Sequence, residues 1–210
     1  ILILDADEVI TPHLAKRLQE IAEKFSHINF VEIPRRNIIF GKALEATGWW
    51  PDYHIRFFKK GSVVWQDKIH SKPQTKGEGL KLEAEDKWSI IHQNYKTVGE
   101  FIEKMNRYTQ IQAEEIKKTD YKFKWQDILQ KPLDEFLSMF FASEGYKDGL
   151  HGLSLSLLQA FSHLVLYLKL WEIEEFKKRE VGVLEFDFES KRGGEALMYW
   201  INEKKQQRFS

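Results

Sequence analysis

The stretch that decides the predicted fold is Ile1-Leu2-Ile3-Leu4-Asp5-Ala6-Asp7-Glu8-Val9-Ile10-Thr11-Pro12. Its four branched apolar residues in a row are typical of a strand buried in a parallel sheet. The strand would end at Asp5 and Asp7, at the sheet edge where α/β proteins bind ligands. Because side chains alternate along an extended backbone, both carboxylates would point to the same side. Two such carboxylates can hold a hard divalent cation, and the cation can hold phosphate oxygens.

The composition narrows the class of protein. A chain of 210 residues is long enough for one domain with a substantial core and a smaller appendage. Lys and Arg number 32 and so do Asp and Glu, so no global charge attracts nucleic acid. The absence of Cys excludes disulfides, thiolate catalysis and Cys-ligated zinc. Aromatic residues make up 14%, which suits sugar binding or a membrane interface.

The start of the chain is unusual, because Ile1 already lies inside a predicted strand and no initiator methionine precedes it. A strand of a parallel sheet needs neighbouring strands and a crossover connection. We therefore expect the chain to be the C-terminal part of a longer protein, with further strands before Ile1.

Thr11 and Pro12 predict the start of a helix, with Thr11 as N-cap and Pro12 at the first helical position. After this helix, the pattern predicts two short strands, Asn29–Ile33 and Ile38–Phe40, joined by the link Pro34–Asn37. Within this link, Arg35 and Arg36 have two interpretations. They either belong to a solvated connection or reach an anionic group, such as a diphosphate near a bound metal.

The stretch Gly48–Phe58 places Asp52 among aromatic residues, directly after Trp49, Trp50 and Pro51. Aromatic surroundings would partly desolvate the carboxylate and raise its pKa, as a general base requires. The alternative is that Asp52 only caps a turn after Pro51. We treat Asp52 as a catalytic candidate and the two tryptophans as candidate substrate-binding residues.

The second half of the chain is predicted to be helical, beginning with a helix capped by Thr97. Gly149 to Leu168 contains no Lys, Arg, Asp or Glu, and about 20 apolar residues would span a bilayer. A buried core helix, an interfacial helix and a membrane span all fit this segment. We favour an interfacial or hairpin-like membrane contact, because Trp171 and several basic residues follow the segment. These basic residues are Lys169, Lys177, Lys178 and Arg179.

Several motifs, in the order in which they occur along the chain, resemble those of the family 2 glycosyltransferases. The apolar strand followed by Asp5-Ala6-Asp7-Glu8 looks like the metal-binding motif of that family. Later stretches resemble the bacterial subgroup that builds lipopolysaccharide core and related surface glycans. These stretches are Pro34–Asn37, Gly48–Arg56, His92 with Lys104–Tyr108, and Gly145–Gly152.

The resemblance implies an α/β GT-A fold, a nucleotide-diphosphate sugar donor, a divalent cation (Mg²⁺ or Mn²⁺) and inversion at the anomeric carbon. By the same resemblance, Asp5 and Asp7 would bind the cation, and Asp52 would deprotonate the acceptor. Arg56 would lie near Asp52 and orient it or the diphosphate. His70 stands where relatives commonly have His followed by Glu, but Ser71 follows here, which weakens its assignment as a metal ligand.

The resemblance also implies how the chain is divided and where it works. Residues 1–95 would form the acceptor-side half of the transferase domain, 96–180 a membrane-associated helical region, and 181–210 a tail with a short helix. The family's uridine-binding strand would precede Ile1, so we expect this chain alone to be inactive. The acceptor would be a glycan or lipid-linked glycan, and the enzyme would work in the cytoplasm, at the inner face of the cytoplasmic membrane.

Two functions from other classes remain open. A haloacid-dehalogenase-type phosphohydrolase also begins with an apolar strand and Asp-x-Asp, and there Asp5 would be a nucleophile. That family needs a later strand followed by an acidic pair, and Glu85-Asp86 precedes Trp88 instead of following a strand. The other alternative is a non-catalytic membrane-associated module that works through Gly149–Leu168.

Overall fold

The computed structural model of the protein describes residues 1–65 and 73–207 and divides the chain into two compact units. The first unit is Ile1–Lys96 and the second is Thr97–Ser210. The sequence predicts the boundary between the α/β half and the helical region between residues 95 and 96, which is one residue before this division. His70, a candidate metal ligand, lies outside the described residues.

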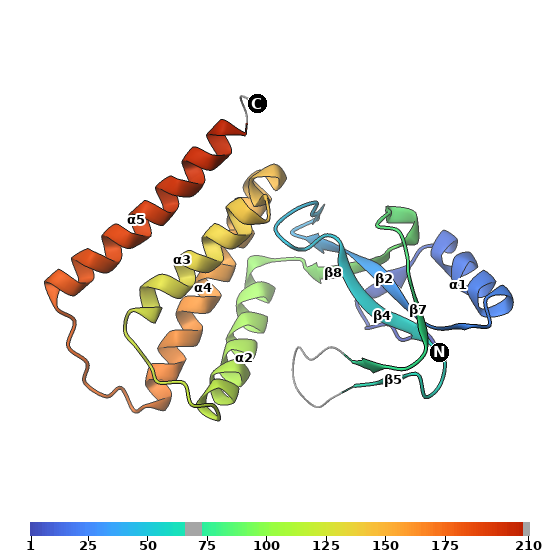
Figure 1. Cartoon of the computed structure of the whole chain (residues 1–210), viewed down its shortest axis with the longest axis horizontal. Coiled ribbons are helices and arrows are strands. Elements are labelled where there is room, and N and C mark those ends of the chain that lie inside the picture. Colours follow the sequence, from blue (N-terminus) through green and yellow to red (C-terminus); the bar gives the residue numbers. More distant parts are fainter. Residues whose placement is uncertain (66–72, 208–210) are drawn as a thin grey trace. The chain divides into compact units, whose positions relative to one another are not determined.

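The first unit contains a mixed sheet, which has six strands within the described residues (Figure 1). The central strand β2 pairs in parallel with β7 and β8 and antiparallel with β3 and β4, while β1 runs antiparallel to β8. The strands are β1 (Glu8–Ile10), β2 (Ile28–Ile39), β3 (Lys42–Ala43), β4 (Asp52–Phe58), β7 (Glu78–Lys81) and β8 (Ile90–Tyr95). Two further short strands, β5 (Val63–Val64) and β6 (Gln74–Thr75), pair with each other. The prediction of a mixed α/β fold is confirmed at this level.

The prediction of a link at Pro34–Asn37 is wrong, because these residues form the middle of the twelve-residue strand β2. Arg35 lies opposite Asp52 of β4 on one side and opposite Ile90 of β8 on the other. Polar residues usually indicate a loop because a buried polar group is costly unless it is paired. Here the neighbouring strands supply those partners, so the chain stays extended.

The prediction of a buried parallel strand at Ile1–Leu4 is also wrong. This segment lies against β4 through an isolated antiparallel bridge between Leu2 and Phe57. Its side chains are at least 36% exposed. The backbone of Ile1 and Ile3 instead bonds to β4, which satisfies its polar groups without burying the side chains.

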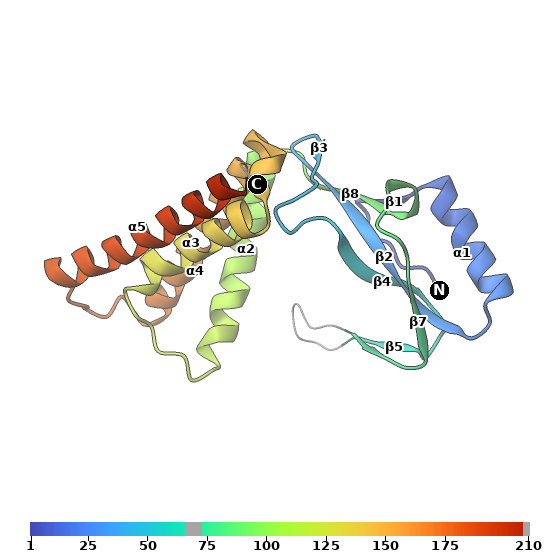
Figure 2. The same cartoon turned by 45° about the horizontal axis from the view of Figure 1, so that its top comes forward.

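Helix α1 (Pro12–Lys24) covers one face of the sheet and supplies much of the core of this unit (Figure 2). The predicted cap at Thr11 is confirmed, because its Oγ accepts the backbone N–H of Leu14 at 3.0 Å. The buried side chains of α1 pack against apolar side chains of β2 and β8 and a neighbouring loop. Full burial of such a side chain contributes about 1.5–3 kcal/mol to folding. This cluster consists of Leu14, Leu18, Ile21, Ile28, Val31, Ile33, Leu82 and Ile90.

The second unit is built from helices, with α4 packed against both α2 and α3 and with α5 packed against α3 (Figure 1). The predicted cap at Thr97 is confirmed by its bond to the N–H of Glu100. The helices are α2 (Val98–Lys117), α3 (Asp127–Leu137), α4 (Leu150–Ile173) and α5 (Val183–Gln206). The prediction of a short helix in the tail is wrong, because α5 has 24 residues and packs on α3.

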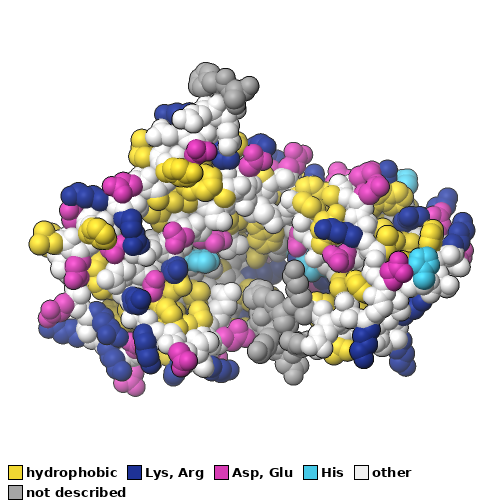
Figure 3. Space-filling model, in the orientation of Figure 1, with side chains coloured by type: hydrophobic (Ala, Val, Ile, Leu, Met, Phe, Trp, Pro, Cys, Tyr) yellow, Lys and Arg dark blue, Asp and Glu magenta, His cyan; other side chains and the backbone are white. Residues whose placement is uncertain are grey.

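Helix α4 contains the uncharged segment predicted from the sequence. Among the described residues, it is the one helix long and apolar enough to cross a membrane, and 22% of its apolar window is buried. Leu155 and Leu170 pack inward, whereas Leu157 and Phe161 are 53% and 45% exposed. Figure 3 shows hydrophobic side chains lying between charged ones on the visible face of this unit. The segment is therefore neither a fully buried core helix nor a helix with a charged outer face.

Candidate functional site

A cluster of charged side chains lies in the sheet of the first unit and is centred on Glu8 of β1. The Glu8 side chain has no exposed surface. Its Oε1 accepts from NH1 of Arg35 at 3.2 Å and from NH2 of Arg56 at 2.9 Å. Two guanidinium groups from neighbouring strands thus neutralise one buried carboxylate, as a buried charge requires.

Asp5 and Asp7 lie on a turn and not on an extended strand. The carbonyl of Asp5 accepts the N–H of Glu8 at 3.0 Å, and the N–H of Asp5 donates back to Glu8 Oε2 at 3.0 Å. The Asp5 carboxylate bonds to Arg56 of β4, whereas the Asp7 carboxylate lies 3.4 Å from Nε2 of His92 on β8. The expectation that both carboxylates share one side of an extended backbone is wrong, because the turn directs them to different strands.

Asp52 lies at the start of β4 and is held from two sides. Its Oδ2 accepts from Nε and NH2 of Arg35, at 2.9 and 2.7 Å, and from Nδ2 of Asn37 at 3.0 Å. Its Oδ1 lies 2.9 Å from Nε2 of His54, two residues along the same strand. The turn-cap interpretation does not describe this residue, because its four contacts are made to side chains.

The predicted rise of the Asp52 pKa is wrong. Burial alone would raise the pKa of this carboxyl, but the bonds from His54, Arg35 and Asn37 together hold its pKa well below the usual range. The carboxyl is therefore ionised at neutral pH and can only accept hydrogen bonds. It follows that the contact with His54 is a bond donated by Nε2, which leaves Nδ1 of a neutral ring with its lone pair.

Asn37 of β2 connects this carboxylate to His92. Its Nδ2 donates to Asp52 and also to the carbonyl of Trp49 at 3.1 Å, and its Oδ1 lies 2.7 Å from Nδ1 of His92. Asn37 is completely buried, and His92 is 7% exposed. A continuous polar chain thus runs from His54 through Asp52, Asn37 and His92 to Asp7.

The residues at the Asp7 end fit a divalent cation. Carboxylates suit Mg²⁺ and Mn²⁺, and neutral imidazole is a common metal ligand. Within residues 1–65 and 73–207, no three His, Cys, Asp or Glu side chains gather as a complete metal cluster. Two protein ligands are enough for a cation that takes its other ligands from water and substrate phosphates, as Mg²⁺ often does. Asp5 could join them only by leaving Arg56.

The other predicted binding residues lie nearby but have partners within the protein. The guanidinium of Arg36 lies 4.4 Å from the ring centroid of Trp50, and its Nε lies 3.1 Å from Asp86. The Trp49 ring meets Tyr95 edge-on, with 6.4 Å between ring centroids. Arg36 and Trp50 therefore stack on each other, and their binding of a diphosphate or a sugar stays a prediction.

Sequence reasoning overlooked the roles of Glu8, Asn37 and His54. The sequence pattern assigns no role to Glu8 and places Asn37 in the link between two strands. One signal was present: Asp52 and His54 are two residues apart in a strand-forming stretch, which places their side chains on one face.

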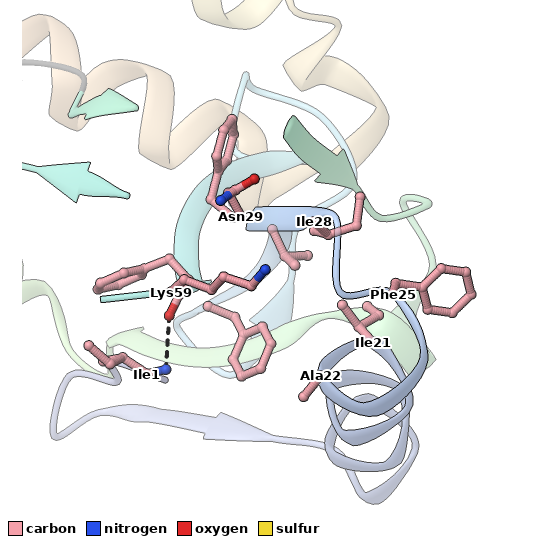
Figure 4. Close-up of a pocket in the computed structure, with 11 residues that line it drawn as sticks. Ile1, Ile21, Ala22, Phe25, Ile28, Asn29 and Lys59 are labelled. Atoms are coloured by element: carbon pink, nitrogen blue, oxygen red, sulfur yellow. Dashed lines mark hydrogen bonds between the residues drawn. The ribbon is translucent and has the colours of Figure 1, made fainter. Parts of the chain in front are cut away.

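A separate cavity of about 180 Å³ lies between α1, β2 and β4 (Figure 4). Apolar side chains such as Ile21, Phe25 and Ile28 line most of it, and the backbone nitrogen of Ile1 donates to the carbonyl of Phe58 at its edge. The residues that line this cavity include Lys59 but no Asp, Glu or His side chain. The polar chain from His54 to Asp7 is therefore the candidate site.

Comparison with known protein families found no family model that matches the chain. Comparison with solved structures found no match either.

Proposed function

We propose that the chain carries the cation-binding and acceptor-side part of an inverting, GT-A-type glycosyltransferase of family 2. The observation that carries this proposal is the polar chain joining Asp7 and His92 to Asp52 and His54. Single-displacement transfer needs charge stabilisation for a departing diphosphate and a base for the acceptor hydroxyl. The two ends of this polar chain, Asp7 with His92 and Asp52 with His54, provide groups suited to these two tasks.

The Asp7 carboxylate and the His92 imidazole are the side chains that would hold Mg²⁺ or Mn²⁺. The bound cation would neutralise negative charge on the diphosphate of a nucleotide sugar. Arg35 and Arg56 lie close by, but both already pair with Glu8. Their contribution is to fix the shape of the site and to offset its carboxylates.

At the Asp52–His54 end of the polar chain, the geometry favours His54 over Asp52 as the group that receives the proton of the acceptor hydroxyl. The oxygens of Asp52 are occupied by Arg35, Asn37 and His54, and its lowered pKa makes it a weak base. The His54 side chain is 37% exposed, and its bond to Asp52 uses Nε2, so Nδ1 is the ring nitrogen that would take the proton. The acceptor hydroxyl gives its proton to Nδ1, its oxygen bonds to the anomeric carbon, and the bond from that carbon to the diphosphate breaks.

The exposed apolar residues of α4 support a second part of the proposal, that the enzyme contacts the inner face of the cytoplasmic membrane, where a glycan or lipid-linked acceptor lies. Four large apolar side chains of this helix are at least 38% exposed, and they are Leu150, Leu157, Phe161 and Leu168. Flotation with phosphatidylglycerol-containing vesicles tests this contact. The double variant L157E/F161E is expected to stay unbound, while the control V98E floats like the wild type.

A phosphohydrolase is less well supported. In that mechanism Asp5 would attack phosphate, but Asp5 follows an exposed segment and bonds to Arg56. Two activity assays on the full-length gene product distinguish a transferase from a phosphohydrolase. A transferase releases nucleoside diphosphate from UDP- or GDP-sugars with Mg²⁺ or Mn²⁺, whereas a phosphohydrolase releases phosphate from p-nitrophenyl phosphate.

A further inference from the structure

Another cavity lies in the second unit, where the C-terminal end of α5 meets the two turns that join α3 to α4 (Figure 2). These turns are Ser138–Ala142 and Gly145–Asp148. The cavity has a volume of about 430 Å³, within the range of roughly 300–1,000 Å³ that small-ligand sites occupy. It is lined by Phe141, Glu144, Tyr146, Lys147, Ile201, Lys204, Lys205 and Gln207. All of these residues belong to the second unit, so the cavity is distinct from the polar chain of the first unit.

This cavity carries more positive than negative charge. Among the described residues, three lysines and one glutamate line it, which gives a formal surplus of two positive charges. Nζ of Lys147 pairs with the Glu144 carboxylate at 2.5 Å, so these two charges offset each other. The surplus therefore belongs to Lys204 and Lys205. A hollow with such a surplus concentrates anions, which favours an anionic ligand over a neutral one.

Lys204 is held at the aromatic side of the cavity. Its Nζ lies 5.8 Å from the ring centroids of both Tyr146 and Trp200. The Trp200 ring in turn stacks on buried Phe141, with 6.2 Å between ring centroids. An ammonium has three N–H donors, and Lys204 gives one of them to Oε1 of Gln207 at 3.2 Å. A phosphate oxygen can therefore accept from another of its N–H groups.

The surface around the cavity combines aromatic, basic and apolar side chains. Tyr199, which meets Trp200 edge-on with 5.9 Å between ring centroids, is 61% exposed. Leu150, two residues after the second turn, is 75% exposed. Tyr and Trp are enriched at the boundary between lipid and water, and basic pockets between helices bind the headgroups of anionic lipids. This combination favours a lipid headgroup over a phosphate compound in solution.

We propose that this cavity binds the phosphate of an anionic phospholipid headgroup, with Lys204 and Lys205 as the charges that contact it. A lysine ammonium is a compact charge that binds phosphate oxygens. This inference rests on the membrane contact of the proposed function and adds the class of lipid to it. Contact through the apolar side chains of α4 alone would not distinguish anionic lipids from neutral ones. The inference does not depend on sugar transfer.

The test is flotation of the 210-residue chain with two kinds of vesicle, phosphatidylcholine alone and phosphatidylcholine mixed with phosphatidylglycerol. The wild type should prefer the mixed vesicles. The variant Lys204→Gln/Lys205→Gln should bind them roughly tenfold more weakly or worse, because each lysine beside an anionic surface contributes to binding. The matched control is Lys117→Gln/Lys118→Gln, which removes two adjacent, exposed lysines at the C-terminal end of α2. This control should bind like the wild type.

Equal binding of the wild type to both kinds of vesicle, or equal losses in the two double variants, would overturn the headgroup site and leave the apolar contact of α4 standing. A wild type that floats with neither vesicle would overturn both. A second measurement does not need the double variant to fold. In NMR of the chain with carbon-13-methylated lysines, the Lys204 and Lys205 signals should shift when soluble dihexanoyl-phosphatidylglycerol is added. Equal shifts with inorganic phosphate would assign the cavity to a soluble phosphate compound and overturn the lipid.

Discussion

NH1 of Arg35 donates to Oε1 of Glu8 across 3.2 Å, and the two side chains are 15% and 0% exposed. Arg56 shares the same carboxylate oxygen, so Glu8 joins β1 to both β2 and β4. Removing one member of a buried ion pair leaves the other charge without compensation.

We therefore predict that Glu8→Gln lowers the free energy of unfolding of the chain by about 3 kcal/mol. Urea unfolding followed by circular dichroism measures the change. The control is Glu45→Gln, whose side chain is 76% exposed and whose pair with Arg36 spans 3.7 Å. A surface pair of this kind contributes at most about 1 kcal/mol. If both variants lost the same free energy of unfolding, the claim that buried Glu8 stabilises the sheet would be contradicted.

Asp52 gives a prediction about acid stability. Because its folded-state pKa is lowered, the bonds of its carboxylate stabilise the folded chain fully above the ordinary value of 3.8. This contribution is lost as the pH falls below that value toward the lower folded-state pKa. Urea midpoints of wild type and Asp52→Asn should therefore differ most near pH 6 and converge below pH 3.8. A gap that widens in acid would show that the Asp52 pKa is raised instead.

Much of the local structure could be predicted from the sequence, because it depends on short-range chemistry. Thr11 and Thr97 each cap a helix with the N–H three residues ahead, and both signals lie within one turn. The mixed α/β class also follows from local patterns, and so does a change of character between residues 95 and 96, one residue before the division after Lys96.

The site could be predicted only in part, because its chemistry depends on partners from distant strands. Asp52 looks like a candidate base in its aromatic stretch, but Arg35 and Asn37 lie 17 and 15 residues away and lower its pKa. Likewise, Ile1–Leu4 has the composition of a buried strand. Which strand it pairs with, and whether a second layer covers it, is decided by tertiary contacts that composition does not encode.

Gly152 allows α4 to pack closely against the preceding turn. A Cβ at this position would lie 1.8 Å from the carbonyl oxygen of Gly145, so a backbone shift is required. We predict that Gly152→Ala lowers the melting temperature despite the better helix propensity of alanine. Gly194→Ala in α5 meets nothing within 4 Å and should stabilise the chain by about 0.5–1 kcal/mol. Differential scanning calorimetry compares them, and stabilisation by Gly152→Ala would contradict the close packing.

His54 gives a prediction about catalysis by the full-length product. His54→Gln should lower kcat roughly 10²–10⁴-fold, as loss of a general base does, with little change in donor KM. The control is His27→Gln, an exposed ring beside Phe25 and outside the polar chain. If His54→Gln keeps its rate while Asp52→Asn loses it, then Asp52 and not His54 receives the proton.

The most direct test of the central claim is nucleotide-sugar turnover by the full-length gene product, measured as nucleoside diphosphate released from UDP- and GDP-sugars. We predict release that requires Mg²⁺ or Mn²⁺ and falls to background in Asp7→Asn, whereas Asp86→Asn, an exposed carboxylate beside Arg36, keeps the wild-type rate. Metal-independent release, full activity of Asp7→Asn, or phosphate release from p-nitrophenyl phosphate without any nucleotide-sugar turnover would contradict the account.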